Sequence, residues 1–166
     1  MEDLQASTLH DVAVKQKVSI AFAESCTGGL IGARITAVSG VSAWFRGSAV
    51  VYATDAKARI LGLDRAGLEE HGPVSVWAAA QLALKARERF GSQIAIAVTG
   101  VAGPDPDERG VLPGMLYVGW ADGENGGVLT HVLDAGGPDG RARVRAEAAD
   151  IALETAIWLA RAHTSE

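Results

Sequence analysis

The stretch AFAESCTGGL (residues 21–30) decides how this chain folds. It completes an apolar run that begins at Val18, and such a short run with β-branched residues is typical of a buried strand over residues 18–23. The polar residues and paired glycines that follow predict a tight turn. Residues 28–38 then read as a helix that ends at a Ser-Gly pair, so the stretch predicts a strand that turns directly into a helix.

The rest of the chain repeats this alternation of apolar runs and amphipathic segments. In chain order we expect a helix over 3–16, a strand over 48–53, a helix capped by Thr54 or Asp55 and running to Leu61, a helix over 73–90, a strand over 93–98, a hairpin of 115–121 and 128–133, and a helix over 139–161. This order predicts an α/β fold: a three-layer domain with a mainly parallel sheet and a late antiparallel hairpin. We expect residues 1–166 to form a single domain.

Composition narrows the functional classes. The net charge of −5 argues against a nucleic-acid binder, because affinity for nucleic acid rests on neutralising phosphates; a local basic pocket for one small phosphate-bearing ligand stays open. A single cysteine and four scattered histidines predict no disulfide and no metal site. The N-terminal residues lack the features of a signal peptide, and no apolar run approaches the length of about 18 residues that a membrane span needs. We therefore expect a cytoplasmic protein with no membrane partner.

Three predicted strands end in polar or glycine-rich loops. These loops are ESCTGG after the first strand, YATDAK after the second and TGVAGPD after the third. Ligands of open α/β sheets bind at the carboxyl ends of the strands. If the sheet is parallel here, the three loops gather at one edge and form a binding or catalytic site.

The first loop holds two candidate nucleophiles, Ser25 and Cys26. Ser25 lies where a strand becomes a helix, so free backbone N–H groups around Thr27, Gly28 and Gly29 could hold an oxyanion or a phosphate. The alternative is that Ser25 or Thr27 only caps the helix. A free cysteine is most often a small buried hydrophobic residue, and no histidine is placed to ionise it, so Ser25 is the favoured nucleophile. Glu24 either orients a neighbour or closes the strand.

The second loop supplies a candidate base. Lys57 follows Tyr52 by five residues and lies in the first turns of a predicted helix. The positive end of the helix dipole and partial burial both lower the pKa of a lysine. Bringing that pKa from ~10.4 to ~7–8 costs about 4 kcal/mol, which is plausible in a desolvated site. The alternative is an ordinary exposed helix lysine.

The remaining candidates are the third loop and the last helix. Thr99 and Gly100 open a glycine-spaced turn that does not match a dinucleotide fingerprint and could be a turn only. Arg141 and Arg145 lie one helical turn apart and could clamp a phosphate or carboxylate, or form a solvated face.

Taken together, the segments AESCTGGLIGARIT, VSAWFRGSAVVYATDAKARILGL, GPVS, AVTGVAGPD and a weaker GRARVR resemble the C-terminal domain family of the competence/damage-inducible protein CinA. Stand-alone members of that family are nicotinamide-nucleotide amidases. The match runs in order from about residue 20 to 160, and since one helix precedes it, the N-terminal domain of CinA is expected to be absent. The resemblance implies a three-layer α/β/α fold with a mixed sheet, commonly in homo-oligomers.

The resemblance also implies an activity: hydrolysis of the carboxamide of nicotinamide mononucleotide, a small-molecule nucleotide, to nicotinate mononucleotide and ammonia, without metal or cofactor. The matching positions make Ser25 the nucleophile, assisted by Tyr52 and Lys57, with Thr99 and Arg141 at the site.

The chain departs from the family pattern after the GP pair. GPDPDERGVLPGML replaces a glycine-rich stretch and a K-P-V-G turn, and no lysine precedes Pro113. The alternative to an amidase is therefore a non-catalytic nucleotide-binding or oligomerisation module of the same fold.

Overall fold

The computed structural model describes residues 3–163. Its helices are α1 (Leu4–Gln16), α2 (Leu30–Thr36), α3 (Thr54–Leu61), α4 (Arg65–His71), α5 (Val76–Phe90) and α6 (Gly140–Ala162), with a short 3₁₀ turn η1 (Val41–Ala43). Its strands are β1 (Ile20–Glu24), β2 (Phe45–Val50), β3 (Ile94–Gly100), β4 (Met115–Asp122) and β5 (Asn125–Val132). Within the described residues, no helix is both long and apolar enough to span a bilayer.

The five strands form one mixed sheet in the order β2-β1-β3-β4-β5. β1 pairs in parallel with β2 and β3, whereas β4 pairs antiparallel with β3 and β5. Only β4 therefore runs against its neighbours. The α/β fold with a mainly parallel mixed sheet and a late hairpin, predicted from the sequence, is confirmed.

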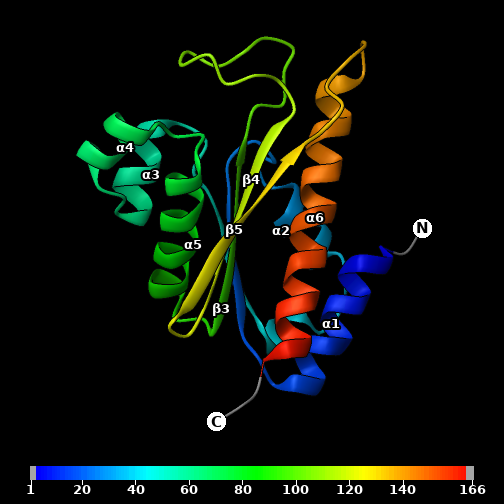
Figure 1. The fold of residues 1–166 in the computed structure, drawn as a ribbon. Coiled ribbons are helices and arrows are strands. Elements are labelled where there is room, and N and C mark those ends of the chain that lie inside the picture. The colour runs from blue at the N-terminus through cyan, green and yellow to red at the C-terminus, as the bar shows by residue number, and fades with distance from the viewer. Residues whose placement is uncertain (1–2, 164–166) are drawn as a thin grey trace.

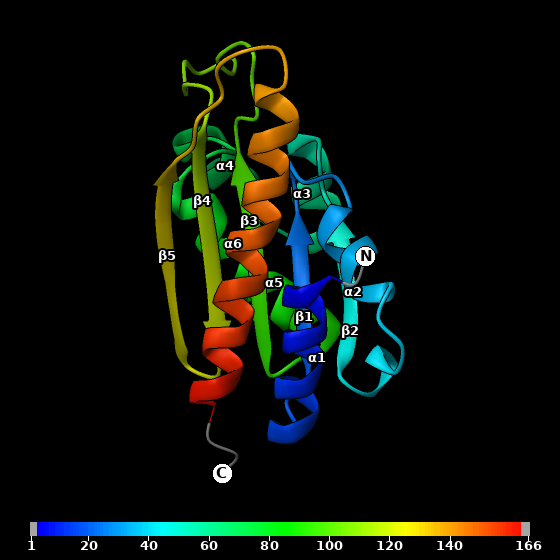
Figure 2. The same cartoon turned by 90° about the vertical axis from the view of Figure 1, so that its right-hand side faces the viewer.

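Helices cover both faces of the sheet, giving three layers. α1, α2 and α6 lie on one face and α3, α4 and α5 on the other (Figures 1 and 2). β1 and β3 alternate large and small side chains, so Phe22 and Ile96 face α6 while Ala95 and Ala97 face α5. This small-residue face lets the alanine-rich α5 lie close to the sheet.

Several boundaries differ from the predictions. The second strand spans Phe45–Val50 rather than 48–53, so Tyr52 lies beyond the sheet. The N-cap of α3 is Ala53, with no side-chain cap from Thr54 or Asp55. The helix predicted over 73–90 begins at Val76, where the Ser75 hydroxyl accepts the N–H of Ala78. α4 was not predicted.

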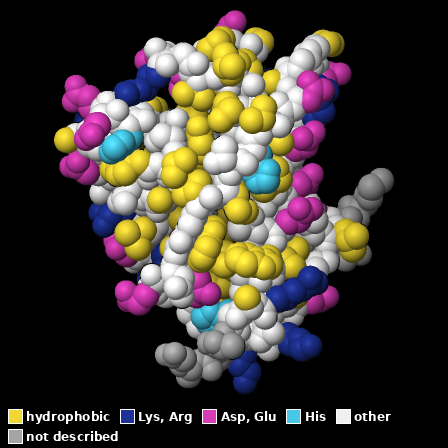
Figure 3. Space-filling model, in the orientation of Figure 1, with side chains coloured by type: hydrophobic (Ala, Val, Ile, Leu, Met, Phe, Trp, Pro, Cys, Tyr) yellow, Lys and Arg dark blue, Asp and Glu magenta, His cyan; other side chains and the backbone are white. Residues whose placement is uncertain are grey.

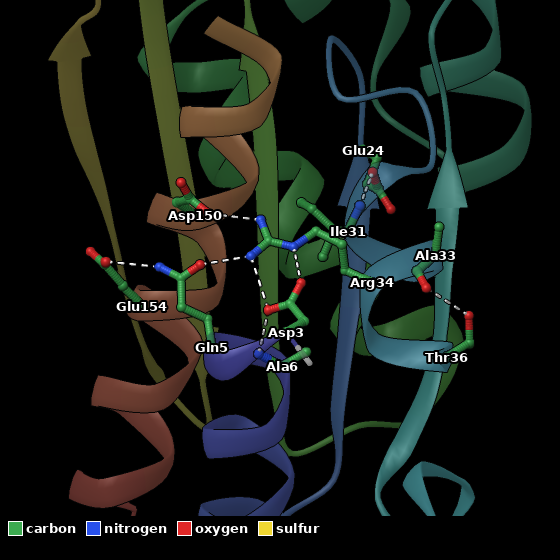
Figure 4. Close-up of polar contacts among 10 residues, drawn as sticks. All are labelled: Asp3, Gln5, Ala6, Glu24, Ile31, Ala33, Arg34, Thr36, Asp150 and Glu154. Carbon is green, nitrogen blue, oxygen red and sulfur yellow. Dashed lines mark hydrogen bonds and ion pairs between the residues drawn. The ribbon is translucent and has the colours of Figure 1, made fainter. Parts of the chain in front are cut away.

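A partly buried polar network joins α2 to α1 and α6 (Figure 4). Arg34 on α2 donates to both carboxylate oxygens of Asp3, to the side-chain oxygen of Gln5 and to the carboxylate of Asp150 on α6. Asp3 also accepts the N–H of Ala6 and so caps α1. The hydrogen bond from Arg34 lowers the pKa of Asp3 below its usual value. Arg34 thereby ties α2, which begins at the end of AFAESCTGGL, to α1 and α6.

The face that carries β5 gathers apolar side chains along its middle, with charged side chains mostly around the rim (Figure 3). β5 is an edge strand of the sheet, and its Leu129 and Val132 are 42% and 75% exposed. The homo-oligomer implied by the family resemblance stays a prediction.

Candidate active site

The three loops predicted to converge do meet at the carboxyl ends of β1, β2 and β3. They enclose a cavity of about 210 Å³. Ser25 and Cys26 line it from the first loop, Tyr52 and Lys57 from the second loop and α3, and Gly100–Gly103 from the third. The parallel pairing of these strands explains the convergence, because their carboxyl ends share one edge.

Ser25 and Lys57 are in direct contact. The Lys57 Nζ donates to the Ser25 Oγ at 3.0 Å, which is hydrogen-bonding distance for a nucleophile and its base. Both side chains are buried. The alternative of an exposed helix lysine is therefore wrong for Lys57.

Backbone carbonyls complete the surroundings of the Lys57 Nζ. It donates to the oxygens of Val51 at 2.9 Å and Tyr52 at 3.2 Å. Burial lowers the pKa of Lys57 to about 8. Val51 and Tyr52 lie in the short connection between β2 and α3, and Lys57 lies in the first turn of α3, so the amine reaches back to these carbonyls. About a tenth of the amine is then neutral at neutral pH.

Glu24 is a completely buried carboxylate at the end of β1. It lies on the same face of the strand as Phe22, directly under the start of α2. Its five hydrogen-bond donors are Thr27 Oγ1, the N–H groups of Gly29, Ile31 and Gly32, and Ser48 Oγ on β2. Figure 4 shows the bond to Ile31. Of the two interpretations of Glu24, orienting its neighbours is the one that the structure supports.

These bonds change the expected role of Thr27, Gly28 and Gly29. The N–H of Gly29 and the hydroxyl of Thr27 are bound to Glu24, and the N–H of Gly28 donates to the Ser25 carbonyl at 3.1 Å. The prediction that the N–H groups of Gly28 and Gly29 are free to hold an oxyanion is therefore wrong. The Glu24 carboxylate, rather than a ligand, accepts the N–H groups at the start of α2.

Tyr52 and Arg141 meet at the mouth of the cavity. The Arg141 guanidinium donates to the Tyr52 Oη at 3.1 Å and to the Gly103 carbonyl at 2.7 Å. The Tyr52 side chain is 60% exposed, and only its carbonyl oxygen contacts Lys57. The structure thus brings both residues to the site, with the phenol at the entrance.

Thr99 and Gly100 lie at the end of β3. The Thr99 hydroxyl is buried and donates to the Pro73 carbonyl at 2.8 Å, which joins the third loop to the segment before α5. Thr99 is not among the cavity-lining residues, whereas Gly100 is. A Cβ at Gly100 would lie 2.7 Å from the Met115 carbonyl oxygen, so the close approach of β4 requires glycine there.

Cys26 lines the cavity beside Ser25, but its side chain packs in the hydrophobic core. Burial raises the pKa of its thiol to about 11. A thiol with this pKa is almost entirely protonated at neutral pH and is a weak nucleophile, in agreement with the choice of Ser25.

Arg145 is a site residue whose role the sequence did not define. Its Nε donates to the Cys26 carbonyl at 3.1 Å and its Nη2 to the Thr27 carbonyl at 2.9 Å. Its helical spacing from Arg141 had placed both on one face, and both reach the site. Arg145 binds the protein's own loop, so neither alternative left open by the sequence, a clamp for a ligand anion or a solvated helix face, describes this residue.

A wider groove of about 1020 Å³ adjoins the cavity. The two share Tyr52, Thr54, Pro73, Val74 and Asp107. The divergent loop after Gly103 forms one wall, and Arg109 fixes it by donating to the carbonyls of Glu69 and Glu70 on α4. The groove gives a bound molecule room beyond the atoms that reach Ser25. In residues 3–163, no three His, Cys, Asp or Glu side chains are grouped as metal ligands.

The chain is similar to known proteins over most of its length. The model of the CinA C-terminal domain matches residues 2–159. A putative competence-damage inducible protein of Halothermothrix orenii is 45% identical over 122 residues, which cover 72% of this chain and 29% of that protein. A CinA-like protein of Frankia casuarinae is 43% identical over 141 residues, covering 85% of this chain and 31% of that protein. This chain thus spans about a third or less of the length of these curated relatives.

Solved structures share the fold over nearly the whole chain. A CinA superfamily protein from Escherichia coli superposes with a TM-score of 0.87 at 27% identity, covering 96% of this chain and 90% of that one. The competence/damage inducible protein CihA from Agrobacterium tumefaciens gives a TM-score of 0.82 at 30% identity, covering 96% and 98%.

Proposed function

Because the chain belongs to the CinA C-terminal domain family, we propose that it is an amidohydrolase that converts nicotinamide mononucleotide to nicotinate mononucleotide and ammonia. The hydrogen bond between the Lys57 Nζ and the Ser25 Oγ is the observation that carries the proposal. A buried lysine in contact with a serine hydroxyl is the arrangement that a serine–lysine hydrolase needs.

In the proposed reaction, neutral Lys57 accepts the hydroxyl proton as the Ser25 Oγ attacks the carboxamide carbon. The C–N bond then breaks, and Lys57 returns the proton to the departing ammonia. A water molecule, activated by the same amine, hydrolyses the acyl-serine ester and regenerates Ser25. Because the pKa of Lys57 is lowered to about 8, part of the amine is neutral near neutral pH and can act as the base.

The cavity and groove support a substrate with two parts. The small cavity at Ser25 suits a compact planar carboxamide, and the adjoining groove gives room for a ribose and phosphate. Arg141 lines the cavity and donates to the hydroxyl of Tyr52, which lines both, and its permanent positive charge suits an anionic ligand. Tyr52 is proposed to orient the substrate at the entrance.

The test is ammonia release from nicotinamide mononucleotide, compared with its riboside and with simple amides. Ser25→Ala should abolish release, whereas Cys26→Ala, a matched change at the neighbouring residue, should keep most of it. Full activity in Ser25→Ala would refute the nucleophile. Release from simple amides but not from the nucleotide would show that the substrate is different. Tight nucleotide binding with no product would favour the non-catalytic module, because such a module has no need of the Ser25–Lys57 contact.

A further inference from the structure

Charged groups of both signs line the cavity at Ser25. Lys57 and Arg141 carry the basic groups, whereas Asp105 and Asp107, from the loop between β3 and β4, carry carboxylates. This loop and the start of α6, which holds Arg141, lie at the same end of the molecule (Figures 1 and 2). The cavity therefore offers a ligand both a cationic and an anionic contact.

These opposite charges do not neutralise one another. Within residues 3–163, Arg141 forms no ion pair, and neither do Asp105 and Asp107. Arg141 donates instead to two neutral oxygens, the Tyr52 hydroxyl and the Gly103 carbonyl. Unpaired charges of both signs in one cavity complement a ligand that itself carries both signs.

The backbone of the loop fixes the carboxylate of Asp107. Its Oδ1 accepts the N–H of Arg109 at 2.9 Å and the N–H of Val111 at 2.8 Å. The Arg109 guanidinium donates to carbonyl oxygens of α4, so the cation of this loop does not pair with the carboxylate. The loop thus holds a negative charge at a set position in the wall of the cavity.

An aromatic ring lies at the same place. Tyr52 and Asp107 both line the cavity as well as the adjoining groove, and the Tyr52 side chain is 60% exposed. The face of an aromatic ring attracts a ligand cation. An exposed ring and carboxylates in one cavity are a suitable set of groups for binding a flat organic cation.

We propose that the cavity selects amides whose ring carries a positive charge, and that Asp105, Asp107 and the ring of Tyr52 form the subsite for that charge. The inference rests on the proposed function in taking nicotinamide mononucleotide, which has a cationic pyridinium ring and an anionic phosphate, as the substrate. Arg141 remains for the phosphate. Both carboxylates belong to the segment that departs from the family pattern.

Nicotinamide mononucleotide and its reduced form test the subsite. The two share the carboxamide, ribose and phosphate, but the ring is cationic in the first and neutral in the second. Titration calorimetry with Ser25→Ala measures binding without turnover. We expect this protein to bind the cationic form about fivefold or more tightly than the reduced form, because only the cationic ring attracts the carboxylates.

Removing one carboxylate at a time should reduce this preference. Asp105→Asn and Asp107→Asn, each in the Ser25→Ala protein, keep the shape of the side chain, and the amide oxygen at position 107 can still accept the two N–H groups. Each should lose about two- to fivefold in affinity for the cationic form, the size of one partly screened charge contact, and keep its affinity for the reduced form. In the active protein, the same changes should raise KM for the nucleotide more than they lower kcat.

Glu70→Gln is the matched control, since it also removes one negative charge. Glu70 is on α4, its side chain is 76% exposed, and it lines neither the cavity nor the groove. Its affinities for the two forms should equal those of the Ser25→Ala parent. This control separates an effect of the subsite from an effect of net charge.

Each outcome decides the inference. Equal binding of the two forms by Ser25→Ala, an equal loss for both forms in the Asp variants, or the same loss in Glu70→Gln would overturn it. If wild-type protein released ammonia equally well from both forms, the amidase would stand and the charge selection would be wrong. If the preference for the cationic form were present and depended on the carboxylates while no ammonia was released, the selection would be established and the proposed function alone refuted.

Discussion

Lys57 carries an amine inside the protein, so replacing it with methionine should change how stability depends on pH. The pKa of this amine is lowered from 10.5 to about 8 by burial. Between these values the unfolded chain binds a proton that the folded chain does not, so the folded state gains stability as the pH rises. Below about pH 8 both states are protonated, and the folded state bears the cost of a buried ammonium group.

The size of the effect follows from the pKa values. Each unit of difference is worth about 1.36 kcal/mol, and between about pH 7 and about pH 9.5 the wild type should gain about 2 kcal/mol relative to Lys57→Met. Titration of other groups is common to both proteins and cancels in the difference. The lost hydrogen bonds to Val51 and Tyr52 add an offset that does not vary with pH.

Urea unfolding of both proteins at several pH values measures this difference. Lys15→Met, at an exposed position of α1, is the matched control, because it removes a lysine side chain that folding does not bury. The stability of this control should stay close to that of the wild type. If the Lys57→Met difference were equally flat, the amine would not titrate near pH 8, and the base assigned to the site would lose its physical basis.

Three further outcomes follow from the structure. Ammonia release should rise about tenfold per pH unit below about pH 8 and level off above it, since neutral Lys57 is the base; a flat rate profile would contradict this. At about pH 8, iodoacetamide should alkylate Cys26 far more slowly in the folded protein than in urea, because a pKa of about 11 leaves about a thousandth of the thiol ionised; equal rates would contradict the burial. Arg34→Met should lower the free energy of unfolding by about 1–2 kcal/mol in urea titrations, since Asp3 loses its partner in a partly buried network; an unchanged unfolding midpoint would refute this.

Much of the site could be predicted because it depends on strand direction. Parallel strands that end in polar loops bring those loops to one edge whatever the details of packing, so the Ser25–Lys57 pair was within reach of sequence reasoning. The position of Tyr52 could not be predicted in this way, because it depends on where β2 ends. The strand stops at Val50, so the Tyr52 carbonyl rather than its hydroxyl contacts Lys57.

Glu24 and Arg145 show a second limit of prediction from the sequence. Strict alternation along β1 could have placed Glu24 on the face that carries α2, since Phe22 and Glu24 are two residues apart. Its bond to Ser48 depends on the register with β2, which local sequence does not specify. The target of Arg145 depends likewise on how α6 lies against the sheet.

α4 was missed although its local signals were present. Asp64 accepts the N–H of Gly67 and caps the helix, a spacing that sequence reasoning can recognise. The glycine obscured the pattern, because glycine weakens the prediction of a helix. It is required by tertiary packing: a Cβ at Gly67 would lie 2.2 Å from the Trp77 ring.

The reversed direction of β4 places the β4–β5 turn at the opposite end of the sheet from Ser25. Asp122 pairs with Ile94 at the start of β3, whereas Gly100 at its end lines the cavity, a separation of about 20 Å along the strand. Gly123 and Glu124 in the turn are exposed. The turn is therefore a natural point for inserting a short peptide that carries a fluorophore or a surface anchor, which gives the protein a handle for single-molecule or immobilised assays without touching its chemistry.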